Sequence, residues 1–212
     1  MWKKTWIVIA SLAIAGCSKK DGAETSPSAS ATMSAPTSAP ATTSVAPAAT
    51  SATPPPDRAD CPKGSKGPGT FDKPCLASGT TRMMDVAWTG KTDDKGPQFR
   101  VTNKSPTVIL YGHIVVYFYD KAGKQLDVKD ETGKTHPNRA CGGNIFGGVM
   151  KAGEKAVLTF SCVKKSMVPE GTAAIEGEMQ TVGFTKDSEE KSDLFWRNND
   201  ITPDTRKKGG VK

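Results

Sequence analysis

Apolar and polar residues alternate along several stretches between residues 82 and 185, and a period of two indicates half-buried β-strands. The apolar positions expected to face inward are Met84, Val86 and Trp88, then Phe99 and Val101, then Ala156, Leu158, Phe160 and Cys162. Glycine-containing turns separate these stretches, and no amphipathic helix longer than about two turns is predicted between them. The pattern therefore predicts an all-β domain, an antiparallel immunoglobulin-like sandwich of about seven short strands.

The longest apolar run, residues 108–119, exceeds the usual length of a strand. Gly112 lies inside this run and predicts a bulge or bend. The turn "DKAG" at 120–123 leads into "KQLDVK", which predicts a hairpin. In "TAAIEGEMQTVGF" the apolar positions change parity near the middle, so we expect a second bulge near Gln180.

The stretch "VTNKSPTVILYGHIVVYFYDKAGKQL", followed by "MKAGEKAVLTF", resembles the FxLYD-type domains of bacterial envelope proteins. The positions that match the pattern of that family are Asn103, Tyr119, Asp120, Gly123, Gly153 and Glu154. The chain departs from the pattern at Val116, Phe118 and Ala152, where the family has Phe, Leu and Pro. The matched positions are turns and core positions, and the family shares no catalytic residues. The resemblance therefore implies a fold and no site.

The stretch "YGHIVVYFYD" has an aromatic second face, formed by Tyr111, His113, Tyr117 and Tyr119. Alternate residues of a strand share a face, so these four side chains lie opposite the core. Three explanations are open for this candidate binding face. The apolar segment Leu194–Trp196 docks on it, or it stacks on the sugar rings of a wall polymer, or it binds another protein. In each case we expect something to cover it.

The first 16 residues have the architecture of an export signal. Lys3 and Lys4 give it a positive start, and the apolar run over residues 6–14 is too short to cross a bilayer. The segment ends in "IAGC", which resembles the lipobox of bacterial lipoproteins. The resemblance implies that Cys17 begins the mature protein and carries the acyl chains of its membrane anchor. Because Ser18 rather than aspartate follows the cysteine, the resemblance favours the outer membrane in a cell with two membranes.

A low-complexity stretch follows the expected anchor. From residue 25 to residue 56 the chain is Ala, Ser, Thr and Pro except for Met33 and Val45. Such a composition buries too little surface to offset its ordering entropy, so we predict a disordered tether that spans about 30–40 Å. The predicted parts are the signal (1–16), the lipidated N-terminus and tether (17–56), a cysteine-containing loop segment (57–81), the β-sandwich core (82–185) and a C-terminal segment with a basic tail (186–212).

Four cysteines besides Cys17 remain: Cys61, Cys75, Cys141 and Cys162. An even number in an exported domain favours two disulfides, and three pairings are possible. Short loops close most easily, so we expect Cys61–Cys75 and Cys141–Cys162, each worth about 3 kcal/mol. A zinc site is the competing interpretation, but there is no Cys-x-x-Cys pair and the two histidines lie far from such a spacing. We predict no metal.

The motifs that indicate catalysis were not found in the sequence. The two "TGKT" stretches lack the upstream glycine of a phosphate-binding loop, and Gly-x-Ser-x-Gly and His-Glu-x-x-His do not occur. Neither His113 nor His136 lies in a motif that indicates a catalytic triad. The acidic residues Asp127, Asp130 and Glu131 suggest a calcium loop, but lysines interleave with them, which favours a solvated charged loop. We predict no catalytic residue and no cofactor.

The formal charge falls from +7 to +5 when Lys3 and Lys4 leave with the signal. Outside the cytoplasm the anionic partners are lipid headgroups, lipopolysaccharide and wall polymers rather than nucleic acid. Much of the excess lies in "RKKGGVK", which we expect to be solvated and frayed. The sequence thus predicts a non-catalytic binding or assembly module, anchored to a membrane through Cys17, with an envelope protein or polymer as partner. An envelope hydrolase, a carbohydrate-binding protein and an inhibitor that acts through the loop "CGGNIFGG" are the alternatives.

Overall fold

The computed structural model describes residues 56–144, 149–186 and 191–211. All of them belong to the unit Ser51–Lys212. The expected signal, the lipidation site Cys17, the tether up to residue 55 and the tip of "CGGNIFGG" (residues 145–148) lie outside the described residues. Within the described ranges, no helix has the length and apolar character needed to cross a membrane.

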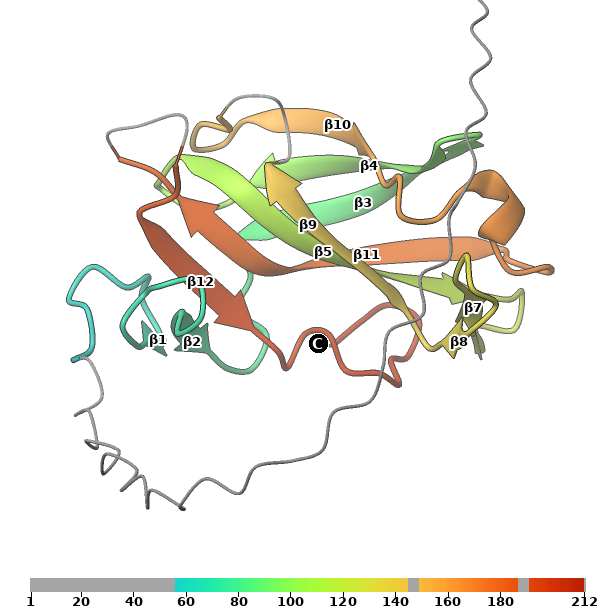
Figure 1. Ribbon diagram of the computed structural model, residues 1–212, viewed down its shortest axis with the longest axis horizontal. Helices are drawn as coiled ribbons and strands as arrows, with labels where there is room; N and C mark the ends of the chain where they lie inside the picture. Colours follow the sequence, from blue (N-terminus) through green and yellow to red (C-terminus); the bar gives the residue numbers. More distant parts are fainter. Residues whose placement is uncertain (1–55, 145–148, 187–190, 212) are drawn as a thin grey trace, which may run out of the picture. The chain divides into compact units, whose positions relative to one another are not determined.

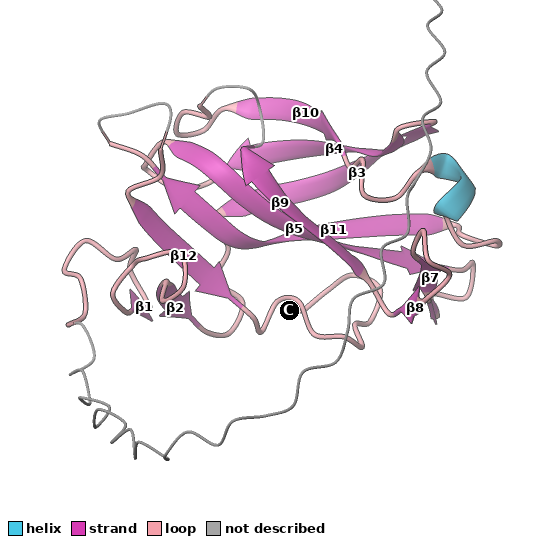
Figure 2. Ribbon diagram, in the orientation of Figure 1, coloured by secondary structure: helices cyan, strands magenta, loops and turns pink. Residues whose placement is uncertain are grey.

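The described residues form an all-β structure with one short 3-10 helix, η1 (Lys165–Met167) (Figures 1 and 2). The strands are β1 (Ser65–Lys66), β2 (Cys75–Ala77), β3 (Met84–Asp93), β4 (Gly96–Asn103), β5 (Ile109–Tyr119), β6 (Gln125–Leu126), β7 (Val128–Lys129), β8 (Thr135–His136), β9 (Arg139–Asn144), β10 (Lys155–Thr159), β11 (Ala174–Phe184) and β12 (Leu194–Asn198). The described residues contain more strands than the seven expected, because five of the strands have only two or three residues. Alternation of apolar and polar residues cannot be recognised in strands this short.

The long strands belong to two sheets. The larger sheet has the order β1-β2-β12-β11-β5-β6, and β9 also pairs with β5. The smaller sheet has the order β10-β4-β3, and β7 pairs with β8 in a separate two-stranded unit. The larger sheet is mixed rather than purely antiparallel, since β2 runs parallel to β12. It also extends beyond the expected core (82–185) on both sides, because β2 precedes that range and β12 follows it.

One hydrophobic core joins the two sheets. Inward residues of the smaller sheet, such as Phe99 and Val101, pack in one cluster with Val116, Val182 and Trp196 of the larger sheet. All five are fully buried. Burial of an aromatic or aliphatic side chain stabilises a fold by about 1.5–3 kcal/mol, so this shared layer is what holds the sheets together.

The register of β5 and β11 shows where alternation is interrupted. It shifts between Met179 and Thr181, which is the bulge expected at Gln180. Of the bulge or bend expected at Gly112, the bulge is wrong, because this residue pairs regularly on both sides, with Val182 of β11 and Gly143 of β9. A second shift lies nearer the start of β5, where Leu110 is skipped between the pairs of Ile109 and Tyr111.

The positions that matched the FxLYD pattern have structural roles in turns. The carbonyl of Asp120 accepts a hydrogen bond from the backbone N–H of Gly123, whose φ of 81° is in the region that favours glycine. Asn103 is buried, and its side-chain amide donates to the carbonyls of Thr107 and Met150. Its side-chain oxygen accepts from Ser105, so one side chain organises the connection from β4 to β5.

The structure contains both expected disulfides. Cys61 pairs with Cys75 across a Cα–Cα distance of 5.7 Å, and Cys141 pairs with Cys162 across 6.3 Å. The first holds the 57–81 segment at the start of β2. The second joins β9 of the larger sheet to the segment that follows β10 of the smaller sheet, so it links the two sheets covalently.

Candidate functional site

The aromatic face of β5 is divided between two covering segments. Tyr117 and Tyr119 are fully buried, whereas Tyr111 and His113 are half-buried. Residues 199–211 lie over the first pair. The loop that carries Phe71 lies beside the second pair.

The half of the face formed by Tyr117 and Tyr119 is sealed. The hydroxyl of Tyr117 donates to the carbonyl of Pro203 at 2.9 Å, and that of Tyr119 donates to the carbonyl of Arg206 at 3.1 Å. The guanidinium of Arg206 also lies over the Tyr117 ring, 4.9 Å from its centre. Burial raises the pKa of both tyrosines. These two predicted site residues are therefore covered by their own chain and not open to a ligand.

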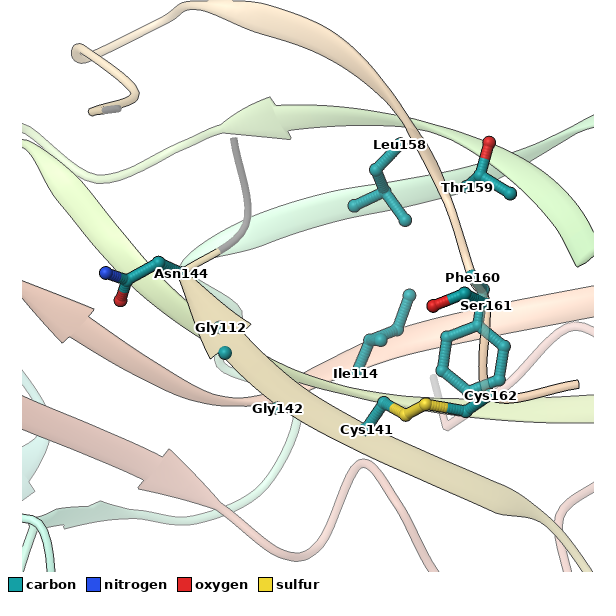
Figure 3. A pocket seen from close by; sticks show the side chains of 11 residues that line it. Gly112, Ile114, Cys141, Gly142, Asn144, Leu158, Thr159, Phe160, Ser161 and Cys162 are labelled. Carbon is teal, nitrogen blue, oxygen red and sulfur yellow. A yellow bond between two sulfur atoms is a disulfide. The ribbon is translucent and has the colours of Figure 1, made fainter. Parts of the chain in front are cut away.

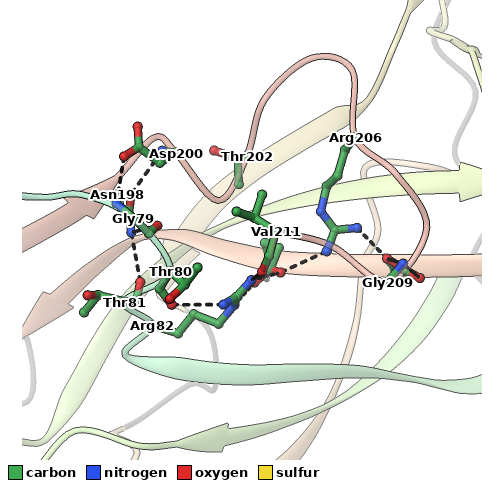
Figure 4. Close-up of polar contacts among 12 residues, drawn as sticks. Gly79, Thr80, Thr81, Arg82, Asn198, Asp200, Thr202, Arg206, Gly209 and Val211 are labelled. Atoms are coloured by element: carbon green, nitrogen blue, oxygen red, sulfur yellow. Dashed lines mark hydrogen bonds and ion pairs between the residues drawn. The ribbon is translucent and has the colours of Figure 1, made fainter.

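Arg206 is the centre of a buried ionic cluster (Figure 4). It pairs with Glu176 and, at 2.9 Å, with Glu178, and the same Glu178 pairs with Arg82 at 2.9 Å. Arg82 in turn donates to the carbonyl of Val211. Burial alone would lower the pKa of Arg206, but hydrogen bonds to its partners outweigh this and raise it. The expectation of a frayed, solvated tail is thus wrong at Arg206, which is 5% exposed.

The segment Leu194–Trp196 does not dock on the face as a tail, because it forms part of β12 within the larger sheet. Leu194 and Trp196 point into the core, and Phe195 points the other way. Only Phe195 therefore meets the aromatic face, where its ring centre lies 5.8 Å from that of Tyr111.

Three rings form an aromatic cluster on the open half of the face: Phe71, Tyr111 and Phe195. Their centres are 5.3–5.8 Å apart and their planes are steeply inclined, which is a favourable edge-to-face geometry. Gly183 makes the approach possible, since it lies between Tyr111 and Phe195 in the sheet. A Cβ at Gly183 would lie 2.8 Å from Tyr111 Cβ and 2.9 Å from the Phe195 ring. Phe71 at the rim remains 49% exposed.

A cleft of about 270 Å³ adjoins this cluster. It is lined by Phe71, Tyr111, His113, Gln180, Thr181 and Arg197. His113 Nδ1 donates to Gln180 Oε1 at 3.1 Å, and Gln180 Nε2 donates to Thr202 Oγ1 at 2.7 Å. Burial lowers the pKa of His113, so its ring is neutral at pH 7. The cleft thus combines aromatic walls with fixed polar groups, which is how small binding sites are commonly built.

Arg197 supplies the positive charge of the cleft. Its Nε donates to Thr181 Oγ1 at 3.1 Å, and its Nη2 lies 3.5 Å from the carbonyl of Phe71. Both acceptors are neutral. In β12, Arg197 is opposite Thr181 on one side and Leu76 of β2 on the other.

Two other cavities have no unpaired charged group among the side chains described for them. A space of about 310 Å³ beside the Cys141–Cys162 disulfide lies between β9 and β10, and none of its lining residues is charged (Figure 3). A space of about 420 Å³ contains the Arg82–Glu178–Arg206 cluster, whose charges are already paired.

The acidic loop binds its own chain. Asp130 accepts hydrogen bonds from Thr132 and His136, which lower its pKa, and Glu131 pairs with Lys164. Across the described ranges, no group of three or more His, Cys, Asp or Glu side chains is placed to hold a metal ion.

Two carboxylates do converge on β11, which is a feature that hydrolases use. Glu176 and Glu178 both point to the outer face, but each accepts hydrogen bonds from Arg206. Their arrangement binds the C-terminal segment to the sheet.

The site contains residues that sequence analysis missed. Phe71 comes from a polar loop, "TFDKPC", and no periodic pattern marks it. Arg197 follows an apolar segment that resembled a docking tail. A signal for Arg206 did exist: Glu176 and Glu178 alternate with apolar residues in one strand, and acids buried on one sheet face require a cation.

No family model and no curated protein matches the chain. The FxLYD-type resemblance therefore stays a prediction. A solved structure of a hypothetical protein from Peptoclostridium difficile 630 is similar over 56% of this chain and 87% of that one, at 13% identity and a TM-score of 0.36. A similarity this low carries no argument about fold class or function.

Proposed function

We propose that this chain is a lipid-anchored protein of the cell envelope, whose immunoglobulin-like β domain binds a partner protein without catalysis. The anchor is Cys17, in the outer membrane if the cell has two. The binding site is the cleft between Phe71 and Arg197, together with its aromatic rim. The tether over residues 17–56 holds the domain away from the lipid surface.

The location is supported by the sequence and by the redox chemistry of the domain. The positive start, the short apolar run and the lipobox-like "IAGC" are in register. Two disulfides occur in the described domain, and such bonds persist in oxidising compartments outside the cytoplasm.

The observation that carries the binding proposal is the exposed aromatic rim of the cleft. Phe71 is 49% exposed and Leu76 is 54% exposed, and Arg197 lies next to both. Aromatic residues and arginine are the side chains that most often anchor protein–protein interfaces. The carboxylates of Glu176 and Glu178 on this face are paired with Arg206, which favours a binding surface over a catalytic one.

A wall polymer is the second candidate partner, because the rings of Phe71 and Tyr111 offer surfaces on which sugars stack. A hydrolase is less supported, since Glu176 and Glu178 are engaged with Arg206.

The anchor is tested by growth of a bacterial host with labelled palmitate. We expect the wild-type chain to be labelled and to fractionate with membranes. The Cys17→Ser variant should lose the label. A wild-type product with an unprocessed amino terminus, or a soluble product without acyl mass, would contradict the proposal.

The binding site is tested by photo-crosslinking in intact cells, with the anchor retained. A photoreactive residue replaces Phe71, and a matched control replaces Val157, which is 60% exposed on β10 of the other sheet. We expect protein adducts from position 71 that position 157 does not give. Adducts that disappear on digestion with glycosidases instead of proteases would identify a polymer partner. Equal labelling from both positions would refute the site.

A further inference from the structure

Two arginines lie on the outer face of the larger sheet, and their surroundings differ. Arg206 is neutralised by Glu176 and Glu178, whose carboxylates it contacts directly. Arg197 has two neutral acceptors, Thr181 Oγ1 and the carbonyl of Phe71. Among the described residues, no carboxylate lies within ion-pair distance of Arg197.

Among the described residues, the positive charge of the cleft around Arg197 is therefore unbalanced. Its other lining residues are Phe71, Tyr111, His113, Gln180 and Thr181. None of them carries a negative charge at neutral pH, and burial keeps His113 uncharged. An arginine that is partly removed from water gains most from a carboxylate, which it can bind through two parallel hydrogen bonds.

Arg197 is also fixed in direction. The hydrogen bond from Nε to Thr181 and the contact of Nη2 with the Phe71 carbonyl hold its guanidinium in the wall of the cleft. Of its donors, Nη1 has no partner in the described part of the chain. A pre-positioned guanidinium loses less entropy when it binds an anion, which increases the affinity.

The rim next to Arg197 is apolar rather than polar. Phe71 and Leu76 are among the most exposed large hydrophobic side chains of the described residues. Leu76 is directly opposite Arg197 in the parallel pair of β2 and β12. An exposed aliphatic side chain packs against the side chain of a protein partner, whereas a sugar is recognised by aromatic rings and hydrogen-bonding groups. This favours a protein partner over an acidic glycan.

We propose that the cleft binds an acidic segment of a partner protein. A carboxylate of that segment pairs with Arg197, and a neighbouring apolar side chain packs against Phe71 and Leu76. The inference rests on the proposed binding function and adds the chemistry of the partner.

Two peptide sets test the proposal against the full chain, purified with its anchor in detergent micelles. One set contains short peptides in which Leu or Phe alternates with Asp or Glu. The matched set has Asn or Gln at the acidic positions. We expect the acidic set to bind and the amide set to bind at least about tenfold more weakly, since hydrogen bonds to charged groups contribute that much. Affinity for the acidic set should fall as salt rises from about 50 to about 500 mM.

Variants locate the effect. Arg197→Gln should weaken binding of the acidic set about tenfold. The affinity of Arg197→Lys should lie between those of Arg197→Gln and the wild type, because lysine keeps the positive charge but cannot donate two parallel hydrogen bonds to one carboxylate. Phe71→Ala should also weaken binding. Arg100→Gln, on the exposed face of β4, and Val157→Ala are the matched controls and should bind as the wild type does. If Arg197→Gln unfolds, Arg197→Lys and the salt dependence of the wild type decide the result.

Equal binding of the acidic and amide sets, or unchanged affinity of Arg197→Gln, would overturn the proposal. Binding of an oligosaccharide of uronic acids in place of the peptides, with the same dependence on Arg197, would overturn the choice of a protein partner. Crosslinking from position 71 that persists without any preference for acidic peptides would refute this inference and leave the proposed function standing. Loss of the crosslinks from position 71 together with the preference for acidic peptides would refute both this inference and the proposed function.

Discussion

Replacement of Arg206 by methionine should destabilise the domain and release its C-terminal segment. The guanidinium of Arg206 is buried and contacts Glu176, Glu178 and the hydroxyl of Tyr119. Removal of one partner from a buried ion pair costs about 3–5 kcal/mol, because the remaining charge is left without compensation.

The cost here should be smaller, for two reasons. Glu178 keeps Arg82, which donates to both of its oxygens at 2.9 Å. Glu176 keeps the backbone N–H of Gly209 and is partly solvated. We therefore expect a loss of about 2–3 kcal/mol in the free energy of unfolding. For a domain of this size that loss corresponds to a fall of roughly 5–10 °C in Tm.

Thermal and urea unfolding followed by circular dichroism measure this loss. Lys207→Ala is the matched control, since Lys207 is the exposed neighbour of Arg206 and its removal should change stability by less than about 0.5 kcal/mol. In Arg206→Met, amide hydrogens of residues 199–211 should exchange faster than those of β5. If Arg206→Met were no less stable than Lys207→Ala, or if the segment kept its protection, the ionic cluster would not be what holds the segment down.

Gly183→Ala should destabilise the domain by about 1–3 kcal/mol, because the new Cβ would overlap Tyr111 and Phe195, whereas Gly143→Ala meets nothing within 4 Å and should be neutral by urea unfolding. Burial raises the pKa of all three tyrosines, so the folded state favours neutral phenols; their contribution to stability should be constant below about pH 10 and fall as pH rises above it. Ultraviolet titration checks this, and reversible ionisation of all three near pH 10 with an unchanged circular dichroism spectrum would contradict it. Replacement of Cys141 and Cys162 by serine should cost about 3 kcal/mol, since it opens a loop whose ends are 21 residues apart. Equal urea midpoints for this variant and the wild type would refute that estimate.

Local patterns predicted much of the fold. Alternation identified the inward residues of β3, β4 and β10, and the parity change in β11 located the bulge at Gln180. Loop length suggested the disulfide pairs that the structure contains. These features depend on neighbours in sequence, so a single chain reveals them.

Features that depend on distant residues were not predictable in the same way. Arg206 lies in a run of basic residues, and nothing local shows that its partners are 28 and 30 residues away on β11. Phe71 belongs to a loop and Arg197 to a strand far along the chain, and the cleft exists because tertiary packing brings them together. Alternation predicted that the four residues of the aromatic face lie together, whereas the segments that cover this face depend on tertiary packing.

Gln180, the extra residue in β11, connects two parts of the outer surface by hydrogen bonds. Deletion of Gln180 would turn the bulge into a regular strand and still leave Glu178 and Thr181 facing outward, because Gln180 and Thr181 both lie on that side and Met179 lies in the core. The residue is therefore not needed for the alternation of the strand. What it supplies is a relay of two hydrogen bonds, from the imidazole of His113 to the hydroxyl of Thr202. Any displacement of the C-terminal segment at Thr202 would thus reach His113 and Gln180 in the lining of the cleft through one amide group.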